Sequence, residues 1–411
     1  MTPFKKNDFP IFSRPYNGKQ LMYLDSAATS QKPQQVIDAL SNFYAYQNSN
    51  IHRGIYKLSE DATALYENIR TTVAQFLNAR EAREIIFTHG ATEGINLVAY
   101  SWARKHLKAG DEILLTVMEH HANLLPWQRI AHEQGVVLKF IPVHDDACPE
   151  LSRRGTLDLE KLDELLSHRT KLVSVVHVSH VLGTHNDIDL ITQRAHAVGA
   201  RVLIDAVQSV PHQKIDVQKV GADFLVFSGH KVLGPTGVGV LYARKEIHDQ
   251  LEPYQLGGGT IVDADFLQAR FLPVPHRLEA GTPPIAQVIG LGVAINYLQE
   301  NTNFRDLQRY EAALCAQLID GLVALPKIKL LGPLDQLKQQ GHIVNFVVDG
   351  FHAHDVAAFL DTHGICVRAG HHCAQPFAKA FNIDASVRVS FYGYNSMDEV
   401  NALINALKLL V

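Results

Sequence analysis

The chain has 411 residues, more than one ordinary hydrophobic core holds, so we expect at least two domains. Hydrophobic residues make up 46% of it and charged residues 19%, a composition that excludes an intrinsically disordered protein. The net charge of −4 gives no sign of a nucleic-acid or membrane partner, and no apolar stretch is long enough for a membrane span. Four cysteines without CxxC spacing fit a reducing compartment, and the first residues lack a secretory signal, so we expect a cytoplasmic enzyme.

Residues 80–245 alternate short apolar runs with stretches of helical periodicity. Several runs are apolar without alternation, as strands buried on both faces are. The runs lie at residues 84–87, 112–115, 136–141, 171–178, 201–204, 223–227 and 237–242. This repetition predicts an α/β fold with a mainly parallel sheet flanked by helices. Ligands of such sheets bind beyond the carboxyl ends of the strands, so the loop residues after each run are the candidates for function.

The pattern changes after about residue 283. Residues 284–325 predict two long helices separated by a polar turn at 301–303. An apolar run at 342–348, a helix from about 353 and a short run at 365–368 follow, and the last helix begins with a capping box at Ser396 and Glu399. We expect a smaller α+β domain here.

Lys231 and Asp205 stand at the ends of two neighbouring runs. A lysine at a strand end can enter a cleft and form a Schiff base if desolvation frees its amine, although a lone lysine is more often a solvated surface residue. Asp205 could cap a turn, or it could pair with a pyridinium nitrogen. An acid followed one strand later by a lysine is the order that a pyridoxal site needs.

Two further strand ends carry candidate residues. Residues 88–94 join a strand to a helix with glycines and Thr92, a composition that binds phosphate at a helix N-terminus but also makes an ordinary cap. His120 follows the strand ending near Thr116, where an imidazole can stack on a cofactor ring and carry protons. The histidine pairs at 120–121 and 371–372 could instead bind a metal. No carboxylate or second cysteine stands at a ligand spacing and HExxH is absent, so we expect no metal site.

Taken together, these segments resemble the class V aminotransferase family of fold-type I pyridoxal enzymes, and most closely its group II, SufS-type cysteine desulfurases. The matching motifs lie at residues 23–29, 50–54, 118–126, 205–208, 228–231 and 368–376, and the last of them is specific to group II. The resemblance implies a large pyridoxal-phosphate domain at 23–290 with a mainly parallel seven-stranded sheet. It also implies a small domain at 291–411 that carries the cysteine loop, with residues 1–22 packed on the small domain.

The resemblance also implies roles around pyridoxal 5′-phosphate. Lys231 would hold the cofactor as a Schiff base and move the substrate's Cα proton. Asp205 would pair with the pyridine nitrogen, and His120 would stack on the ring and assist proton transfer. The other implied cofactor contacts are Ala91, Thr92, His180, Gln208, Ser228, His230 and Thr282, of which Thr282 would reach the phosphate of the partner subunit.

On the substrate side, the resemblance implies that Arg388 grips the carboxylate with its planar fork. The other residues lining that side would be Ala28, His52, Arg53 and Arg368. Cys373 would take the sulfur as a persulfide while alanine leaves, and nearby cations would favour its reactive thiolate. A free cysteine is often a small buried hydrophobe, but the flanking glycine, histidines and proline favour a loop position and the catalytic interpretation.

Two positions depart from the family's pattern. His180 stands where the family usually has an asparagine near the ring oxygen, so we expect altered cofactor tuning or substrate preference. The segment around residues 144–155 is longer than usual, and we expect an exposed surface loop there.

The resulting expectation is a homodimeric cysteine desulfurase that passes sulfur to an acceptor protein of the SufE or SufU type for iron–sulfur cluster assembly. One alternative keeps the fold and changes the substrate, as a selenocysteine lyase or a dual enzyme. A second alternative is a cofactor-binding scaffold without turnover, which the intact Lys231 and Cys373 disfavour.

Overall fold

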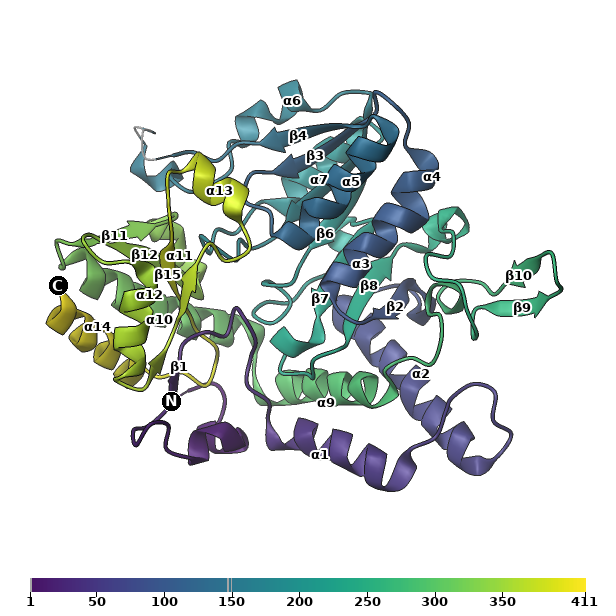
Figure 1. Cartoon of the computed structure of the whole chain (residues 1–411), viewed down its shortest axis with the longest axis horizontal. Helices are drawn as coiled ribbons and strands as arrows, with labels where there is room; N and C mark the ends of the chain where they lie inside the picture. Colours follow the sequence, from purple (N-terminus) through teal and green to yellow (C-terminus); the bar gives the residue numbers. More distant parts are fainter. Residues whose placement is uncertain (1, 146–147, 149) are drawn as a thin grey trace.

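The protein was analysed as a computed structural model that describes residues 2–145, 148 and 150–411. A seven-stranded sheet forms its centre (Figure 1). In spatial order the strands are β2 (Ile85–Thr88), β8 (Gly239–Ala243), β7 (Phe224–Ser228), β6 (Arg201–Asp205), β5 (Thr170–Val176), β3 (Glu112–Thr116) and β4 (Val137–Ile141). Strand β8 is antiparallel to both of its neighbours, and the remaining pairs in the sheet are parallel. The predicted mainly parallel α/β sheet is therefore confirmed.

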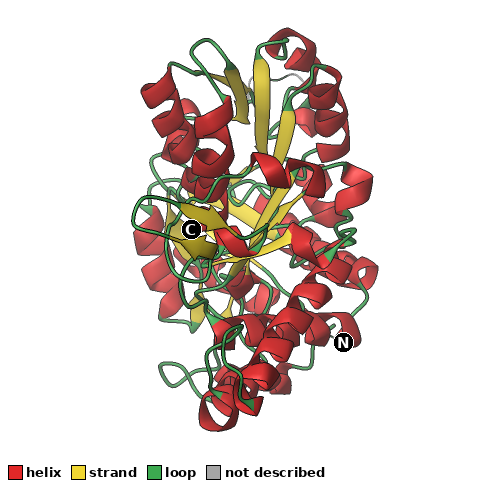
Figure 2. Cartoon of the chain, turned by 90° about the vertical axis from the view of Figure 1, so that its right-hand side faces the viewer, coloured by secondary structure: helices red, strands yellow, loops and turns green. Residues whose placement is uncertain are grey.

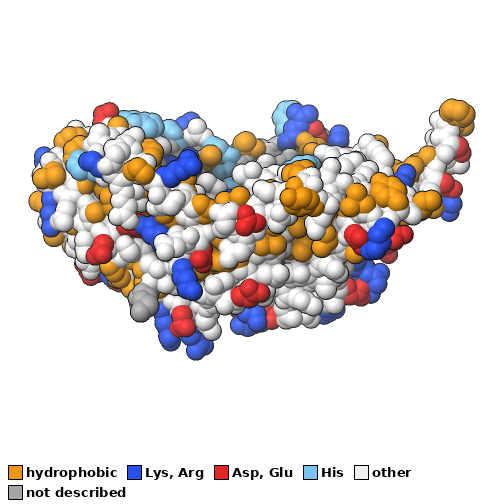
Figure 3. All heavy atoms as spheres, turned by 90° about the horizontal axis from the view of Figure 1, so that it is seen from below, with side chains coloured by type: hydrophobic (Ala, Val, Ile, Leu, Met, Phe, Trp, Pro, Cys, Tyr) orange, Lys and Arg blue, Asp and Glu red, His pale blue; other side chains and the backbone are white. Residues whose placement is uncertain are grey.

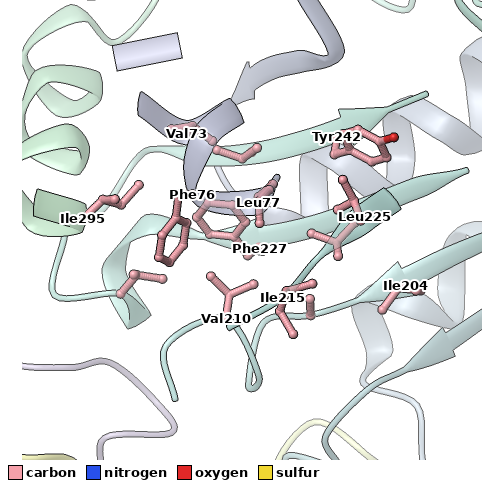
Figure 4. Packing of buried hydrophobic residues seen from close by; sticks show 14 of the residues in the cluster. Val73, Phe76, Leu77, Ile204, Val210, Ile215, Leu225, Phe227, Tyr242 and Ile295 are labelled. Carbon is pink, nitrogen blue, oxygen red and sulfur yellow. The ribbon is translucent and has the colours of Figure 1, made fainter. Parts of the chain in front are cut away.

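Helices cover both faces of this sheet (Figure 2). One face packs on α3 (Ala91–Val98) and α5 (Leu125–Gln134), and the other packs on α2 (Lys57–Leu77), α7 (Ile188–Ala197) and α9 (Ile285–Asn301). Alternate residues of β7 pack into the hydrophobic cores on the two faces of the sheet, because successive side chains of a strand point to opposite faces. In Figure 4, Leu225 and Phe227 of β7 lie against Phe76 and Leu77 of α2. Burying each such side chain contributes roughly 2 kcal/mol to folding.

The remaining helices around the large sheet have nine residues or fewer. Helix α1 packs along α9 below the sheet (Figure 1). These helices are α1 (Gln34–Asn42), α4 (Arg104–His106), α6 (Leu162–Leu165) and α8 (Val217–Val220).

A second, four-stranded sheet lies beside the first. Its order is β11 (Ile328–Leu331), β12 (Ile343–Val348), β15 (Ser386–Ser390) and β14 (Arg368–Gly370), with all pairs antiparallel. The helices of this part are α10 (Phe304–Val323), α11 (Leu334–Gln340), α12 (Ala353–Asp361), α13 (Gln375–Ala380) and α14 (Met397–Leu410). Helix α14 begins with the predicted capping box, in which Ser396 Oγ accepts the Glu399 N–H.

The N-terminal segment lies against the four-stranded part. Phe4 donates its N–H to the Gly393 carbonyl at 3.1 Å, and β1 (Met22–Tyr23) pairs in parallel with β13 (Ile365–Cys366). The predicted boundary at residues 290 and 291 falls inside helix α9. The three-part division remains a prediction.

Two further segments stand apart from the cores. A hairpin of β9 (Ile261–Ala264) and β10 (Ala269–Phe271), absent from the sequence prediction, projects from the large sheet's end of the molecule (Figure 1). In the long segment at 144–155, Asp146, Ala147 and Pro149 lie outside the described residues, so the predicted surface loop stays a prediction. In the described part of the chain, no helix combines the length and apolar character needed to cross a membrane.

Candidate active site

A cavity of about 290 Å³ opens at the carboxyl ends of the large sheet's parallel strands. Thirteen of the sequence-predicted site residues line it, and they come from segments far apart in the chain. They are Ala28, Ala91, Thr92, His120, His180, Asp205, Gln208, Ser228, His230, Lys231, Arg368, Cys373 and Arg388. The parallel topology explains the convergence, since the ends of β2, β3, β5, β6 and β7 meet at one edge.

Asp205 and Lys231 face the cavity from neighbouring strands. Asp205 ends β6 and is buried; its Oδ1 accepts the Val207 N–H at 3.0 Å. Burial raises the pKa of this carboxyl, and a cationic partner would offset that penalty. Burial, reinforced by the Arg388 guanidinium, lowers the pKa of Lys231 to about 8. A neutral, nucleophilic amine is thus more accessible at Lys231 than on an ordinary lysine.

A close approach of strand β8 to the loop before α3 shapes one end of the cavity. Helix α3 begins at Ala91, whose N–H donates to Ser228 Oγ at 2.9 Å, and Thr92 is exposed at the same helix end. A Cβ on Gly239 would lie 2.5 Å from Cα of Gly90, so only glycine lets β8 pass this loop. The helix N-terminus with two hydroxyl side chains fits an anionic group.

His120 lies against the cavity in a defined tautomer. Its Nδ1 accepts the Ala122 N–H at 3.0 Å, so the neutral ring carries its proton on Nε2. Burial, together with the nearby Lys231, lowers the pKa of His120 to about 4. The imidazole is therefore neutral at physiological pH.

Two arginines share one carboxylate at the opposite side of the cavity. Arg368 Nη2 lies 2.9 Å from Asp25 Oδ2, and Arg388 Nη2 lies 3.3 Å from Asp25 Oδ1. Two cations against one anion leave a net positive charge, which suits a carboxylate ligand. The sequence reasoning did not assign Asp25 a role, because its partners are more than three hundred residues away along the chain.

Cys373 lies on an exposed turn that also lines the cavity. His372 and Cys373 both have left-handed backbone conformations, with φ of 53° and 59°. The Cys373 carbonyl accepts the His121 N–H at 2.9 Å, and His372 Nε2 lies 3.0 Å from Ser386 Oγ. His372 and the small residues Ala27, Ala122, Val176 and Val207 line the cavity without having been predicted. Ala27, Ala122, Val207 and His372 lie within the matching motif segments, but their residue types did not assign them a role in the site.

Three predicted site residues lie elsewhere. His52, Arg53 and Thr282 line a separate groove with Gly258 and Gly281, and their site roles remain predictions. Within the described residues, the two groups that come close enough to share a metal ion are His52 with Glu67 and His276, and His212 with Glu311 and His342. Neither group includes the histidine pairs weighed as metal ligands from the sequence.

The donor set of the cavity fits pyridoxal 5′-phosphate. Asp205 would face the ring nitrogen, Lys231 the aldehyde carbon, and Ser228 with the start of α3 the phosphate. Gln208, predicted to touch the ring oxygen, donates its amide to the Ala27 carbonyl at 2.8 Å beneath the cavity.

Comparison with known proteins agrees with this geometry. Residues 22–403 match the model of the aminotransferase class-V family. A probable cysteine desulfurase of Synechocystis is 45% identical over 406 residues, which cover 99% of this chain and 94% of that protein. A cysteine desulfurase of Enterobacter sp. (strain 638) is 45% identical over 402 residues, covering 98% and 96%. The apo structure of a cysteine desulfurase from Thermococcus onnurineus NA1 superposes with a TM-score of 0.92 at 39% identity, covering 100% of this chain and 99% of that one. The chain belongs to the aminotransferase class-V family and, within it, to the cysteine desulfurases.

Proposed function

We propose that the protein is a pyridoxal-phosphate-dependent cysteine desulfurase that converts L-cysteine to L-alanine and passes the sulfur from Cys373 to an acceptor. One observation carries the proposal: Lys231, Asp205 and Cys373, from three distant parts of the chain, line a single cavity. A cofactor-binding scaffold would not need a thiol at that position.

The substrate would be held by its carboxylate. Arg388 and Arg368 supply the positive charge, and Asp25 fixes the orientation of both guanidinium groups. Arg388 is also held by its Nη1, which donates to the His180 carbonyl at 2.9 Å. A carboxylate anchored there orients the rest of a small amino acid toward Lys231.

Lys231 would act as the base at the substrate's Cα. Its lowered pKa of about 8 keeps a useful fraction of neutral amine near neutral pH. Pyridoxal 5′-phosphate, when bound, supplies an electron sink for the charge left at Cα. Neutral His120 carries an Nε2–H donor, which can assist proton transfer alongside Lys231.

Cys373 would then take the sulfur. Its thiolate attacks the substrate sulfur, a new S–S bond forms, and the substrate's Cβ–S bond breaks with its electron pair passing to carbon. Proton uptake at that carbon completes alanine. L-cysteine and the Cys373 thiol thus become L-alanine and a Cys373 persulfide, with atoms and electrons balanced.

The exposure of Cys373 supports transfer to a protein acceptor. We propose an acceptor of the SufE or SufU type, a role in iron–sulfur cluster assembly, and a group II, SufS-type enzyme. We also propose a cytoplasmic location, since all four cysteines are free thiols. A homodimer would let His52, Arg53 and Thr282 serve the partner's cavity.

The deciding experiment replaces Cys373 with alanine in the loaded enzyme. We expect alanine and sulfide release from cysteine to fall by about two orders of magnitude, while the cofactor's absorption still responds to cysteine. Cys366→Ala is the matched control, because that half-buried thiol lies outside the cavity. Wild-type turnover in Cys373→Ala would refute the assignment. Running both substrates tests the selenocysteine lyase alternative, which predicts a much smaller loss with selenocysteine than with cysteine.

A further inference from the structure

His180 occupies a rigid turn just after β5. The turn is closed on itself, since the Ser179 N–H donates to the Thr184 carbonyl and the Leu182 N–H donates to Ser179 Oγ. The His180 ring is buried and lines the cavity. The His180 and His120 rings meet in an edge-to-face arrangement, with centroids 4.8 Å apart.

The two ring nitrogens of His180 differ in their partners. Nε2 lies 2.8 Å from the backbone carbonyl of His372, the residue before Cys373. A carbonyl only accepts, so Nε2 carries the hydrogen. Burial, together with His120 and Arg388, holds the pKa of His180 well below its ordinary value, so the ring is neutral. Nδ1 is then a bare acceptor, and it is buried without a partner among the described residues.

The segment that His180 contacts needs external support. His372 and Cys373 are consecutive non-glycine residues with positive φ, a conformation that L-residues seldom adopt and that surrounding contacts must maintain. Two donors from the large sheet's loops hold the two successive carbonyls: His180 Nε2 on His372 and the His121 N–H on Cys373. Of these, only the His180 donor belongs to a side chain.

We infer that His180 is a positioning residue, which fixes the Cys373 turn over the cavity through its Nε2–H bond to the His372 carbonyl. The inference rests on the proposed function, because it concerns delivery of the Cys373 thiol to the substrate sulfur. This role also explains in physical terms what a histidine at position 180 does that the family's usual asparagine would not. An asparagine amide ends at the position of the imidazole Nδ1 and does not reach the His372 carbonyl.

Two amide variants separate the two nitrogens, because each places an amide nitrogen near the position of one of them. In His180→Gln, the amide nitrogen sits three bonds from Cβ, as Nε2 does, so the bond to His372 can be kept. In His180→Asn, the amide takes the place of Nδ1 and the bond is lost. Hydrogen–deuterium exchange of residues 371–376 in the holoenzyme measures the turn directly, without any catalytic readout.

We expect exchange in His180→Asn to be roughly five- to tenfold faster, the factor that loss of one buried hydrogen bond produces. Persulfide formation on Cys373, followed by mass spectrometry, should slow by about tenfold in the same variant. Solvent exchange of the substrate's Cα proton, which needs Lys231 and not Cys373, should fall by a clearly smaller factor than persulfide formation does. His180→Gln should keep the wild-type protection of residues 371–376 and the wild-type ratio of persulfide formation to Cα exchange.

Unchanged protection in His180→Asn, or protection lost equally in His180→Gln, would overturn the inference. So would a fall in Cα exchange as large as the fall in persulfide formation, because His180 would then act on the cofactor. Should His180→Asn fail to fold, His180→Leu removes the same hydrogen bond with an apolar side chain and replaces it in the comparison with His180→Gln. His185→Asn is the control, since His185 lies on the same turn with its Nε2 also buried but outside the cavity. A wild type that forms no alanine from cysteine would defeat the proposed function and leave the exchange result intact.

Discussion

Four donors converge on the backbone carbonyl of His230, directly before Lys231. They are the Ser30 N–H and Oγ, both at 3.1 Å, Thr29 Oγ1 at 3.0 Å and Lys32 Nζ at 2.8 Å. Such a carbonyl fixes the peptide group from which the Lys231 side chain starts. Burial lowers the pKa of Lys32 to about 7, so its amine titrates close to physiological pH.

The Lys32 pKa leads to a testable pH dependence. The folded value lies below the unfolded value of about 10.4, so between pH 7 and 10 the unfolded chain binds more protons and stability rises with pH. After allowance for solvent screening, we expect a contribution of about 1–2 kcal/mol between pH 7 and 9. The Lys32→Met variant should not show this increase in stability between pH 7 and 9. Melting temperatures of both proteins at the two pH values measure the difference, and an identical pH response would contradict the prediction.

At the scale of elements, the β9–β10 hairpin presents an apolar tip to solvent. Phe266 and Leu267 at its turn are almost fully exposed, and the space-filling view shows hydrophobic side chains at the end of this projection (Figure 3). Between the strands, Arg270 pairs with Asp263 through two hydrogen bonds of 2.8 and 2.6 Å. A two-stranded ribbon is marginal alone, so an exposed tip of this kind suits an interface with a second copy of the chain.

Removing the apolar tip should therefore weaken the proposed homodimer. We expect the double variant Phe266→Ser, Leu267→Ser to raise the dimer dissociation constant at least about tenfold, since buried apolar anchors carry most interface energy. Sedimentation velocity across a dilution series measures it. Val323→Ser is the control, because Val323 is an exposed apolar residue on α10. A dimer equally stable in both variants would place the interface elsewhere.

At the scale of the whole molecule, the elements that could be predicted from the sequence are the buried ones. Strands buried on both faces are uniformly apolar, so the runs that became β2, β3, β6 and β7 were recognisable. The antiparallel direction of β8 follows from its short connection to β7, because residues 229–238 are too few for a parallel crossover. The hairpin gave no such signal, because its side chains face solvent and lack a core-facing pattern.

In the candidate site, too, some residues could be predicted from the sequence and some contacts could not. Strand-end residues such as Asp205 could be picked out because the sheet's topology brings them together. The pairing of Asp25 with Arg388 joins residues without a shared motif, and only the fold creates it. His180's bond to the His372 carbonyl likewise depends on where a distant turn lies.

A buried hydrogen-bonded pair, His212 and Glu311, connects the part of the molecule around the seven-stranded sheet to the part around the four-stranded sheet. His212, in the loop after β6, places Nδ1 3.0 Å from both carboxyl oxygens of Glu311 on α10, and the ring stacks on His342 with centroids 3.7 Å apart. Burial raises the pKa of Glu311 well above its usual range and lowers that of His212 to about 3. Both shifts favour the uncharged pair, which needs an oxygen acceptor at position 311 and no negative charge.

Substitutions at Glu311 test that interpretation. Glu311→Gln keeps an oxygen for the His212 Nδ1–H, so we expect a loss of stability below about 1 kcal/mol. Glu311→Ala leaves a cavity and an unpaired buried imidazole, and we expect a loss of about 3 kcal/mol. Differential scanning calorimetry of the two variants gives the comparison. If glutamine destabilised the protein as much as alanine, the pair would have to be ionic, and the link between the two parts would depend on a buried charge instead of on a shared hydrogen.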